Sequence, residues 1–174
     1  MTRPKTNPGK KSNPCESMAK KVYEIPSNRK AIKEFSEKAI KTVKHAGVDM
    51  DLHQLELILL EALTNALLYG NFQISSKTRD EKGEDFFWQL VEEREKDANF
   101  AARKIVLEAD CVEDELRFKV RDEGEGFDWR NYLESIDTGK TERFHDRGIL
   151  LIQNYADELS WNDKGNEITF AIKL

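Results

Sequence analysis

The sequence is poor in the residues that cross-link a small fold or bind transition metals. Its 174 residues include two cysteines, Cys15 and Cys111, and three histidines. This suggests neither a disulfide framework nor a cysteine-rich metal cluster, so we expect two ordinary thiols. The histidines, His45, His53 and His145, are scattered along the chain and are expected to be ordinary surface residues.

Long apolar runs are also missing. None approaches the roughly 20 residues that a membrane-spanning helix needs, and the basic N-terminus lacks the apolar segment of a signal peptide. The sequence therefore favours a cytoplasmic protein that does not contact a membrane. With 174 residues, 39% of them hydrophobic, the chain is long enough for one domain with a sizeable core.

Charge is distributed unevenly along the chain. Residues 1–21 contain six basic residues and one acidic residue, whereas residues 22–174 contain 22 basic and 32 acidic residues. We predict that residues 1–20 form a disordered basic tail, because they combine this charge with proline, glycine and small polar residues. Residues 21–174 are expected to form one acidic domain, which argues against a direct nucleic-acid-binding surface there.

Hydrophobic periodicity predicts an alternation of helices and strands. Helices are expected at 29–45, 52–69, 84–96 and 148–156, and strands at 21–25, 104–109, 116–121, 158–161 and 167–173. Ser27 is expected to cap the first helix and Asp51 the second. The charged stretch 73–101 is predicted to be a helical insertion whose aromatic residues pack on the domain or on a partner.

The helix predicted at 52–69 carries an acid and an amide on one face. Glu61 and Asn65 are four residues apart and therefore project together from a helix that is otherwise apolar nearly all round. Polar groups on a buried helix are costly unless something binds them. Two interpretations fit this pair: two solvated residues on an amphipathic helix, or a site for hydrated magnesium and phosphates.

Two further motifs follow the Glu61–Asn65 helix. Asp122 comes directly after a predicted strand and is followed by Gly124 and Gly126, which let backbone approach a ligand. Alone, such a string is typical of a glycine-rich turn. Further on, Arg147 and Gly148 open a predicted helix, where exposed N–H groups and the helix dipole favour phosphate.

The order of these motifs resembles the ATPase superfamily that includes gyrase, histidine kinases and MutL (the GHKL superfamily). Residues 147–152, 156–158 and 165–169 are similar specifically to the bacterial anti-sigma factor serine kinase branch, as is Ile25-Pro26-Ser27. The resemblance covers about residues 22–174. It implies an α+β two-layer sandwich of the Bergerat type, with a mixed, mainly antiparallel sheet and helices on one face.

The resemblance also implies roles for individual residues. Glu61 matches the catalytic general base, and Asn65 matches the magnesium-binding amide. Asp122 matches the aspartate that recognises the adenine amine. The family's nucleotide-contacting residues are matched here by Gly124, Gly126, Arg147 and Gly148. Of these, Arg147 is a candidate for stabilising phosphate charge across a dimer. Burial is expected to raise the pKa of Glu61, which suits a base.

One position departs from the anti-sigma factor kinase pattern. That branch shows Gly-Arg-Gly before the last helix, whereas this chain has Asp146-Arg147-Gly148. A carboxylate that faced inward would repel a triphosphate. The loop from Asp128 to Asp146 is expected to form the lid over the nucleotide, so lid closure and phosphoryl transfer depend on how this loop accommodates Asp146.

Three functions are compatible with these features. The leading hypothesis is an ATP- and Mg²⁺-dependent protein serine/threonine kinase that acts as an anti-sigma factor. It would bind a sigma factor and phosphorylate a small antagonist protein. The resemblance also implies a homodimer as one possible assembly. The alternative is a nucleotide-responsive partner-binding module with weak or no kinase activity. A histidine kinase fragment is disfavoured because no phosphoacceptor helix pair precedes the domain in this sequence.

Overall fold

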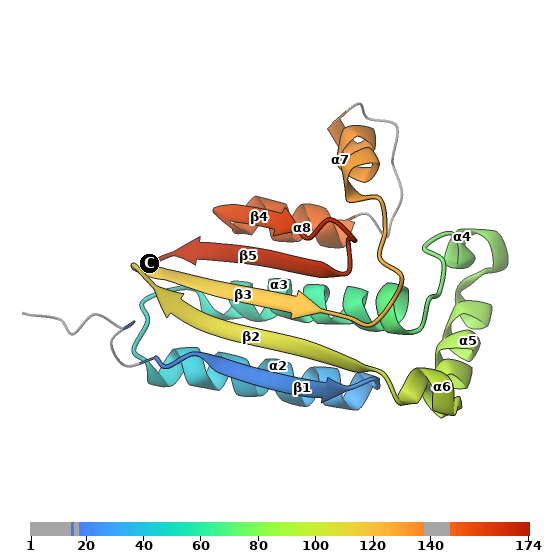
Figure 1. Cartoon of the computed structure of the whole chain (residues 1–174), viewed down its shortest axis with the longest axis horizontal. Helices are drawn as coiled ribbons and strands as arrows, with labels where there is room; N and C mark the ends of the chain where they lie inside the picture. Colours follow the sequence, from blue (N-terminus) through green and yellow to red (C-terminus); the bar gives the residue numbers. More distant parts are fainter. Residues whose placement is uncertain (1–14, 16–17, 138–146) are drawn as a thin grey trace, which may run out of the picture.

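The computed structural model describes residues 15, 18–137 and 147–174, and its strands form one five-stranded sheet (Figure 1). The strand order is β1-β2-β3-β5-β4, and every described pair is antiparallel. The bounds are β1 (Lys21–Pro26), β2 (Lys104–Val112), β3 (Glu115–Arg121), β4 (Glu158–Trp161) and β5 (Glu167–Lys173). Thus β3, which leads into Asp122, lies at the centre of the sheet.

Helices cover one face of this sheet. Helices α2 and α3 run along it, with α8 beside α3. The bounds are α2 (Arg29–His45), α3 (Leu52–Asn65), the π-helix η1 (Ala66–Asn71), α4 (Thr78–Lys82), α5 (Glu84–Lys96), α6 (Ala98–Ala101), α7 (Trp129–Asp137) and α8 (Arg147–Tyr155). The predicted α+β sandwich, with helices on one face of a mainly antiparallel sheet, is confirmed.

The core lies between the sheet and the α2–α3 layer. Side chains alternate along β2 and β3, so that residues such as Leu107 and Phe118 are fully buried while their neighbours face outward. Phe118 stacks on Phe170 of β5 with ring centroids 5.4 Å apart. From α3, Leu55 and Leu59 enter the same core. The leucine-rich helix is therefore fixed against the sheet, as its apolar composition predicts.

Capping differs in one place from the sequence expectation. The side chain of Asn28, not Ser27, caps α2, accepting a hydrogen bond from the Ala31 N–H at 2.8 Å. Ser27 instead donates to the Arg103 carbonyl at 2.7 Å. The expectation for α3 is confirmed, since the Asp51 side chain accepts from the first-turn N–H groups.

The helix predicted to run from residue 52 to residue 69 changes its hydrogen-bond pattern at Asn65. It continues as the π-helix η1, in which the Phe72 N–H bonds to the Leu67 carbonyl at 2.8 Å. A π-turn accommodates one extra residue, so residues after Asn65 rotate relative to an α-helix. Tyr69 and Gly70 then face the same side of the molecule as Asn65.

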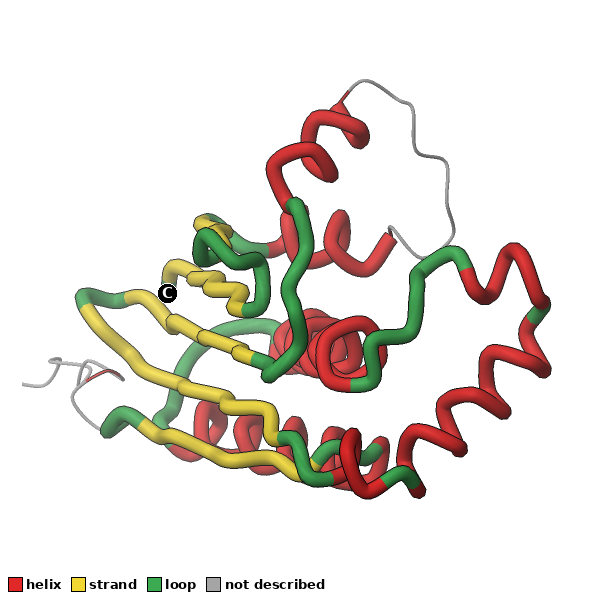
Figure 2. The backbone as a smooth tube through the Cα atoms, turned by 45° about the vertical axis from the view of Figure 1, so that its right-hand side comes forward, coloured by secondary structure: helices red, strands yellow, loops and turns green. Residues whose placement is uncertain are grey.

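The inserted helices α4, α5 and α6 lie where β1 ends and β2 begins, at the right of Figures 1 and 2. Phe87 and Val91 of α5 are buried against the domain, while Phe86 and Trp88 remain 39% and 37% exposed. Arg29 of α2 binds Glu95 of α5 at 2.9 Å. The insertion therefore packs on the domain through part of its aromatic face.

The expectation of two ordinary thiols is wrong. Cys15 and Cys111 form a disulfide across 96 residues, with Cα atoms 4.9 Å apart. The sequence does not indicate this pairing, because the two cysteines are far apart in the chain. They meet only when the segment before β1 lies beside the end of β2. Of the predicted tail, Cys15 is tied to β2, and Met18 is buried.

None of the described helices is long and apolar enough to span a bilayer.

Candidate functional site

A cavity of about 280 Å³ opens between the α3–η1 helix, the loop after β3 and the β4–β5 hairpin. Its volume is near the lower end of the range of about 300–1,000 Å³ for small-molecule sites. Aromatic and aliphatic side chains form most of its wall. The polar groups that line it include Asn65, Asp122 and Asn166. The cavity therefore combines an apolar wall with a few convergent polar groups.

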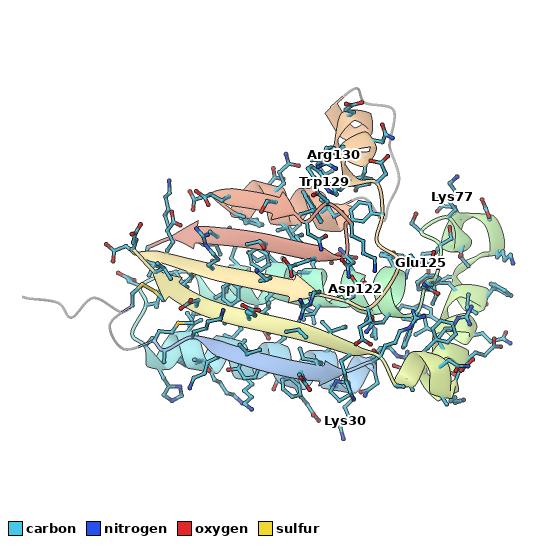
Figure 3. All side chains as sticks on the ribbon, viewed as in Figure 1. Lys30, Lys77, Asp122, Glu125, Trp129 and Arg130 are labelled. Carbon is cyan, nitrogen blue, oxygen red and sulfur yellow. A yellow bond between two sulfur atoms is a disulfide. The ribbon has the colours of Figure 1, made fainter. Side chains whose placement is uncertain are left out.

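Asp122 lies at the end of β3, as Figure 3 shows, and its carboxylate lines the cavity. Its Oδ1 accepts the Gly124 N–H at 2.8 Å. A Cβ atom at Gly70 would overlap this carboxyl group, and one at Gly124 would overlap the Gly70 carbonyl. The two glycines therefore allow η1 and the β3 loop to approach closely enough to enclose Asp122.

Burial raises the pKa of Asp122 from 3.8 to about 6, more than the Gly124 N–H bond and the charge of Lys164 lower it. Ionising this carboxylate thus has a substantial free-energy cost in the folded protein. A strongly perturbed acid that lines a cavity is a candidate binding group, because a ligand with a hydrogen-bond donor would stabilise its ionised form.

The backbone around Asp122 is fixed from the hairpin side. The Asp122 N–H donates to the Asn166 carbonyl at 3.0 Å, and the Asn166 side-chain amide donates to the Asp122 carbonyl at 2.7 Å. Asn162 in turn holds Asn166, accepting its N–H at 3.1 Å. The β4–β5 turn therefore sets the position of the loop that carries Asp122.

Glu61 and Asn65 project from the same side of α3 and are hydrogen-bonded to each other, but only Asn65 is among the residues that line the cavity. The Glu61 carboxylate rests against the backbone of Gly148, where a Cβ atom would overlap Oε1. Burial raises the pKa of Glu61, as expected from the sequence, and the bond to Asn65 partly offsets this. Glu61 is therefore partly buried where α3 meets the first turn of α8.

An aromatic cluster from the loop after β3, the start of α7 and β4 forms one wall of the cavity. Trp129 of α7 stacks on Trp161 of β4 with centroids 5.7 Å apart, and its Nε1–H donates to the Asn162 carbonyl at 2.9 Å. Phe127 packs edge-on against Trp161, and both line the cavity. Sequence reasoning missed these residues. A signal was available, since Phe127 and Trp129 closely follow the glycine turn.

Arg130, which follows Trp129 at the start of α7 (Figure 3), makes a further contact with the hairpin at the surface. Its guanidinium lies 2.9 Å from the Asp163 carboxylate and 4.3 Å from the Trp129 ring centroid. The start of the predicted lid therefore contacts the hairpin mainly through the Trp129 indole, and the exposed ion pair adds little. Asp146 and the Arg147 side chain lie outside the described part of the structure, so their predicted roles remain predictions.

The described side chains could supply only part of the coordination shell of a magnesium ion at this site. Within residues 15, 18–137 and 147–174, no group of three or more His, Cys, Asp or Glu side chains could hold a metal ion. The Asn65 amide oxygen is a hard donor suited to a cation that keeps several waters. The remaining ligands would be water and an anion, and the first turn of α8 favours an anion.

Comparison with protein families gives one match that spans nearly the whole sheet. The model described as "Histidine kinase-like ATPase domain" matches residues 25–172, from β1 to β5. The match includes Glu61, Asn65, Asp122 and Gly148. A search of curated proteins finds no match.

Proposed function

Because the chain belongs to the histidine kinase-like ATPase domain family, we propose that it binds Mg-ATP beside Asp122 and phosphorylates Ser or Thr of a small antagonist protein. In this proposal it also binds a sigma factor, so that it acts as an anti-sigma factor in transcription regulation. The observation that supports it best is Asp122, a half-buried carboxylate enclosed by glycines at the wall of an apolar cavity.

Asp122 would recognise the nucleotide base. Its carboxylate, with a pKa raised to about 6 by burial, is mostly ionised at neutral pH and accepts hydrogen bonds. The exocyclic amine of adenine is a donor, whereas guanine presents a carbonyl oxygen at the equivalent position and would face the carboxylate unfavourably. Phe127 and Trp161 supply the apolar wall against which a base can pack.

Asn65 and Gly148 would serve the phosphate end of the site. The Asn65 amide oxygen would contribute one ligand to Mg²⁺. Bound to phosphate oxygens, the ion would neutralise charge on the transferred group. Gly148 lies in the first turn of the nine-residue helix α8, and its missing side chain allows the Glu61 carboxylate to approach the backbone there.

Glu61 would act as the general base toward the substrate hydroxyl. Its pKa is raised by burial, so it accepts a proton more readily than an exposed glutamate does. Its bond to Asn65 fixes the carboxylate beside the metal ligand. Phosphoryl transfer requires mainly such positioning and charge neutralisation.

The anti-sigma factor assignment is supported by the similarity of residues 147–152, 156–158 and 165–169 to that branch. These segments form the first part of α8, the entry to β4, and the end of the β4–β5 turn with the start of β5. The first and third of them contribute residues to the wall of the proposed nucleotide site. A protein of this kind would exchange partners according to the bound nucleotide. A homodimer would let Arg147 of one subunit approach the phosphates of the other.

A nucleotide-responsive binding module remains the alternative. One observation favours it: the Glu61 carboxylate is already engaged by Asn65 and packed on Gly148. A base held in this way must release one contact before it can reach a substrate hydroxyl. In the sequence, Asp146 stands where the related kinases have glycine, and a carboxylate that faced inward would repel a triphosphate.

Transfer of labelled phosphate distinguishes the two proposals. The purified protein would be incubated with γ-labelled Mg-ATP and candidate antagonist proteins encoded nearby, alongside Glu61→Gln and the exposed-site control Glu34→Gln. Transfer that disappears in Glu61→Gln while nucleotide still binds supports the kinase. Binding without transfer in wild type supports the module. If wild type does not bind ATP and Asp122→Asn changes nothing, nucleotide binding is excluded.

A further inference from the structure

The geometry points to Asn71 as a positioning residue for recognition of the nucleotide base, acting through the loop that carries Asp122. This inference rests on the proposed nucleotide binding. Asn71 is the last residue of the π-helix η1 and is fully buried, at 0% exposure. It does not line the cavity. Any effect it has on a ligand must therefore be transmitted by the residues it holds.

Asn71 joins three segments that are distant in the sequence. Its Oδ1 accepts the Glu123 N–H at 2.7 Å. Its Nδ2 donates to Ser27 Oγ at 2.7 Å and to the Lys104 carbonyl at 3.0 Å. Its own carbonyl accepts a hydrogen bond from Arg103 Nη1 at 2.6 Å. The end of β1, the start of β2 and the loop after β3 thus meet at one side chain.

The Glu123 contact is the one that reaches the proposed site. Asn71 fixes the peptide N–H that directly follows Asp122, while Asn166 fixes the N–H and carbonyl of Asp122 itself. The Glu123 side chain is also held, by the Lys104 N–H at 3.1 Å. Asp122 therefore lies between two asparagine anchors, one from the helix layer and one from the hairpin.

The two anchors hold opposite edges of one peptide group, Asn166 at the Asp122 carbonyl and Asn71 at the Glu123 N–H. The Gly124 N–H that binds Asp122 Oδ1 lies one peptide further along, so its position depends on how firmly both edges are held. Gly124 carries no side chain that could restrain the loop instead. Loss of the Asn71 amide should therefore broaden the orientations of Asp122, without removing any group that contacts the base.

Arg103 gives Asn71 a second connection to Asp122. Its guanidinium donates to the Asn71 carbonyl and contributes to lowering the pKa of Asp122 by its charge. Arg103 also lies over the Phe100 ring of α6, at 5.1 Å from its centroid. The point where the inserted helices rejoin the sheet is therefore linked to the base-recognition loop.

A double-mutant cycle with two nucleotides tests this inference. Mg-ATP and Mg-GTP affinities would be measured by equilibrium binding for wild type, Asn71→Ala, Asp122→Asn and the double variant. Asn71→Ala is expected to weaken ATP binding about tenfold, the size of a lost buried hydrogen-bond network. It should weaken GTP binding far less, so that the preference for ATP falls. In the Asp122→Asn background it should have little further effect, because the coupled residues act as a unit.

Two further variants keep the test interpretable. Asn99→Ala removes an exposed asparagine of α6 and should leave both affinities unchanged. Ser27→Ala removes one partner of Asn71 Nδ2 and should reduce the ATP preference in the same direction, which covers the case in which Asn71→Ala does not fold. Equal losses for ATP and GTP, or additive losses in the double variant, would overturn the inference. Wild type that binds no nucleotide would instead refute the proposed function.

Discussion

Replacing Asp122 by asparagine should stabilise the protein at neutral pH, although it removes a residue proposed to bind nucleotide. The raised pKa means that the folded state binds a proton at Asp122 more tightly than the unfolded chain does. The stability contributed by protonated Asp122 is therefore fully present below pH 3.8 and is lost as the pH rises through about 6. Asparagine does not ionise, so the variant keeps that stability.

The size of the effect follows from the two pKa values. A folded-state pKa of about 6 against 3.8 corresponds to an upper limit of about 3 kcal/mol at pH 7.5. At pH 5 the same relation gives about 1.6 kcal/mol, because the folded protein is then still mostly protonated at this site. The stability difference between Asp122→Asn and wild type should thus be about 1.4 kcal/mol larger at pH 7.5 than at pH 5.

Urea denaturation at the two pH values, followed by the fluorescence of the three tryptophans, measures this difference. Every other carboxylate is common to both proteins and cancels. Asp49→Asn is the matched control for the loss of one negative charge, since Asp49 is exposed. A stability difference that is independent of pH, or that is larger at pH 5, would refute the assignment of a costly buried carboxylate at Asp122.

Three further changes probe other parts of the structure. Gly148→Ala should displace the Glu61 carboxylate, because the new Cβ would overlap Oε1. Urea denaturation should then show a loss of more than about 1 kcal/mol in the free energy of unfolding. Unchanged stability would contradict the close contact. Cys111→Ser removes the disulfide to Cys15 and should lower the free energy of unfolding by about 2–4 kcal/mol. Its melting temperature should fall, and wild type should show the same fall when a reductant is added. A wild type indifferent to reductant would argue against this disulfide. Asn28→Ala should cost about 1 kcal/mol by loss of the α2 cap, and no change in the urea midpoint would assign the cap elsewhere.

The sequence predicts the elements better than it predicts the contacts between them. Helices α2 and α5 and strands β4 and β5 begin and end at the predicted residues, because amphipathic periodicity and turn residues act locally. The Cys15–Cys111 pair and the hydrogen bonds of Asn71 depend instead on which strands become neighbours. No local pattern encodes that choice, so neither could be predicted from spacing.

The π-helix shows why the helix motif alone left the candidate site incomplete. The prediction of one helix over residues 52–69 assumes that the α-helical period of 3.6 residues per turn continues past Asn65. The π-turn changes that period directly after Asn65, and it is what places Gly70 against Asp122 and Asn71 against Glu123. The helix motif and the aspartate turn are thus parts of one site joined by an irregular helix end. A substitution that restored regular α-helical geometry in η1 should therefore impair the Asp122 loop more than it impairs the core, because Gly70 and Asn71 would lose their alignment with that loop while Leu55 and Leu59 would stay in place.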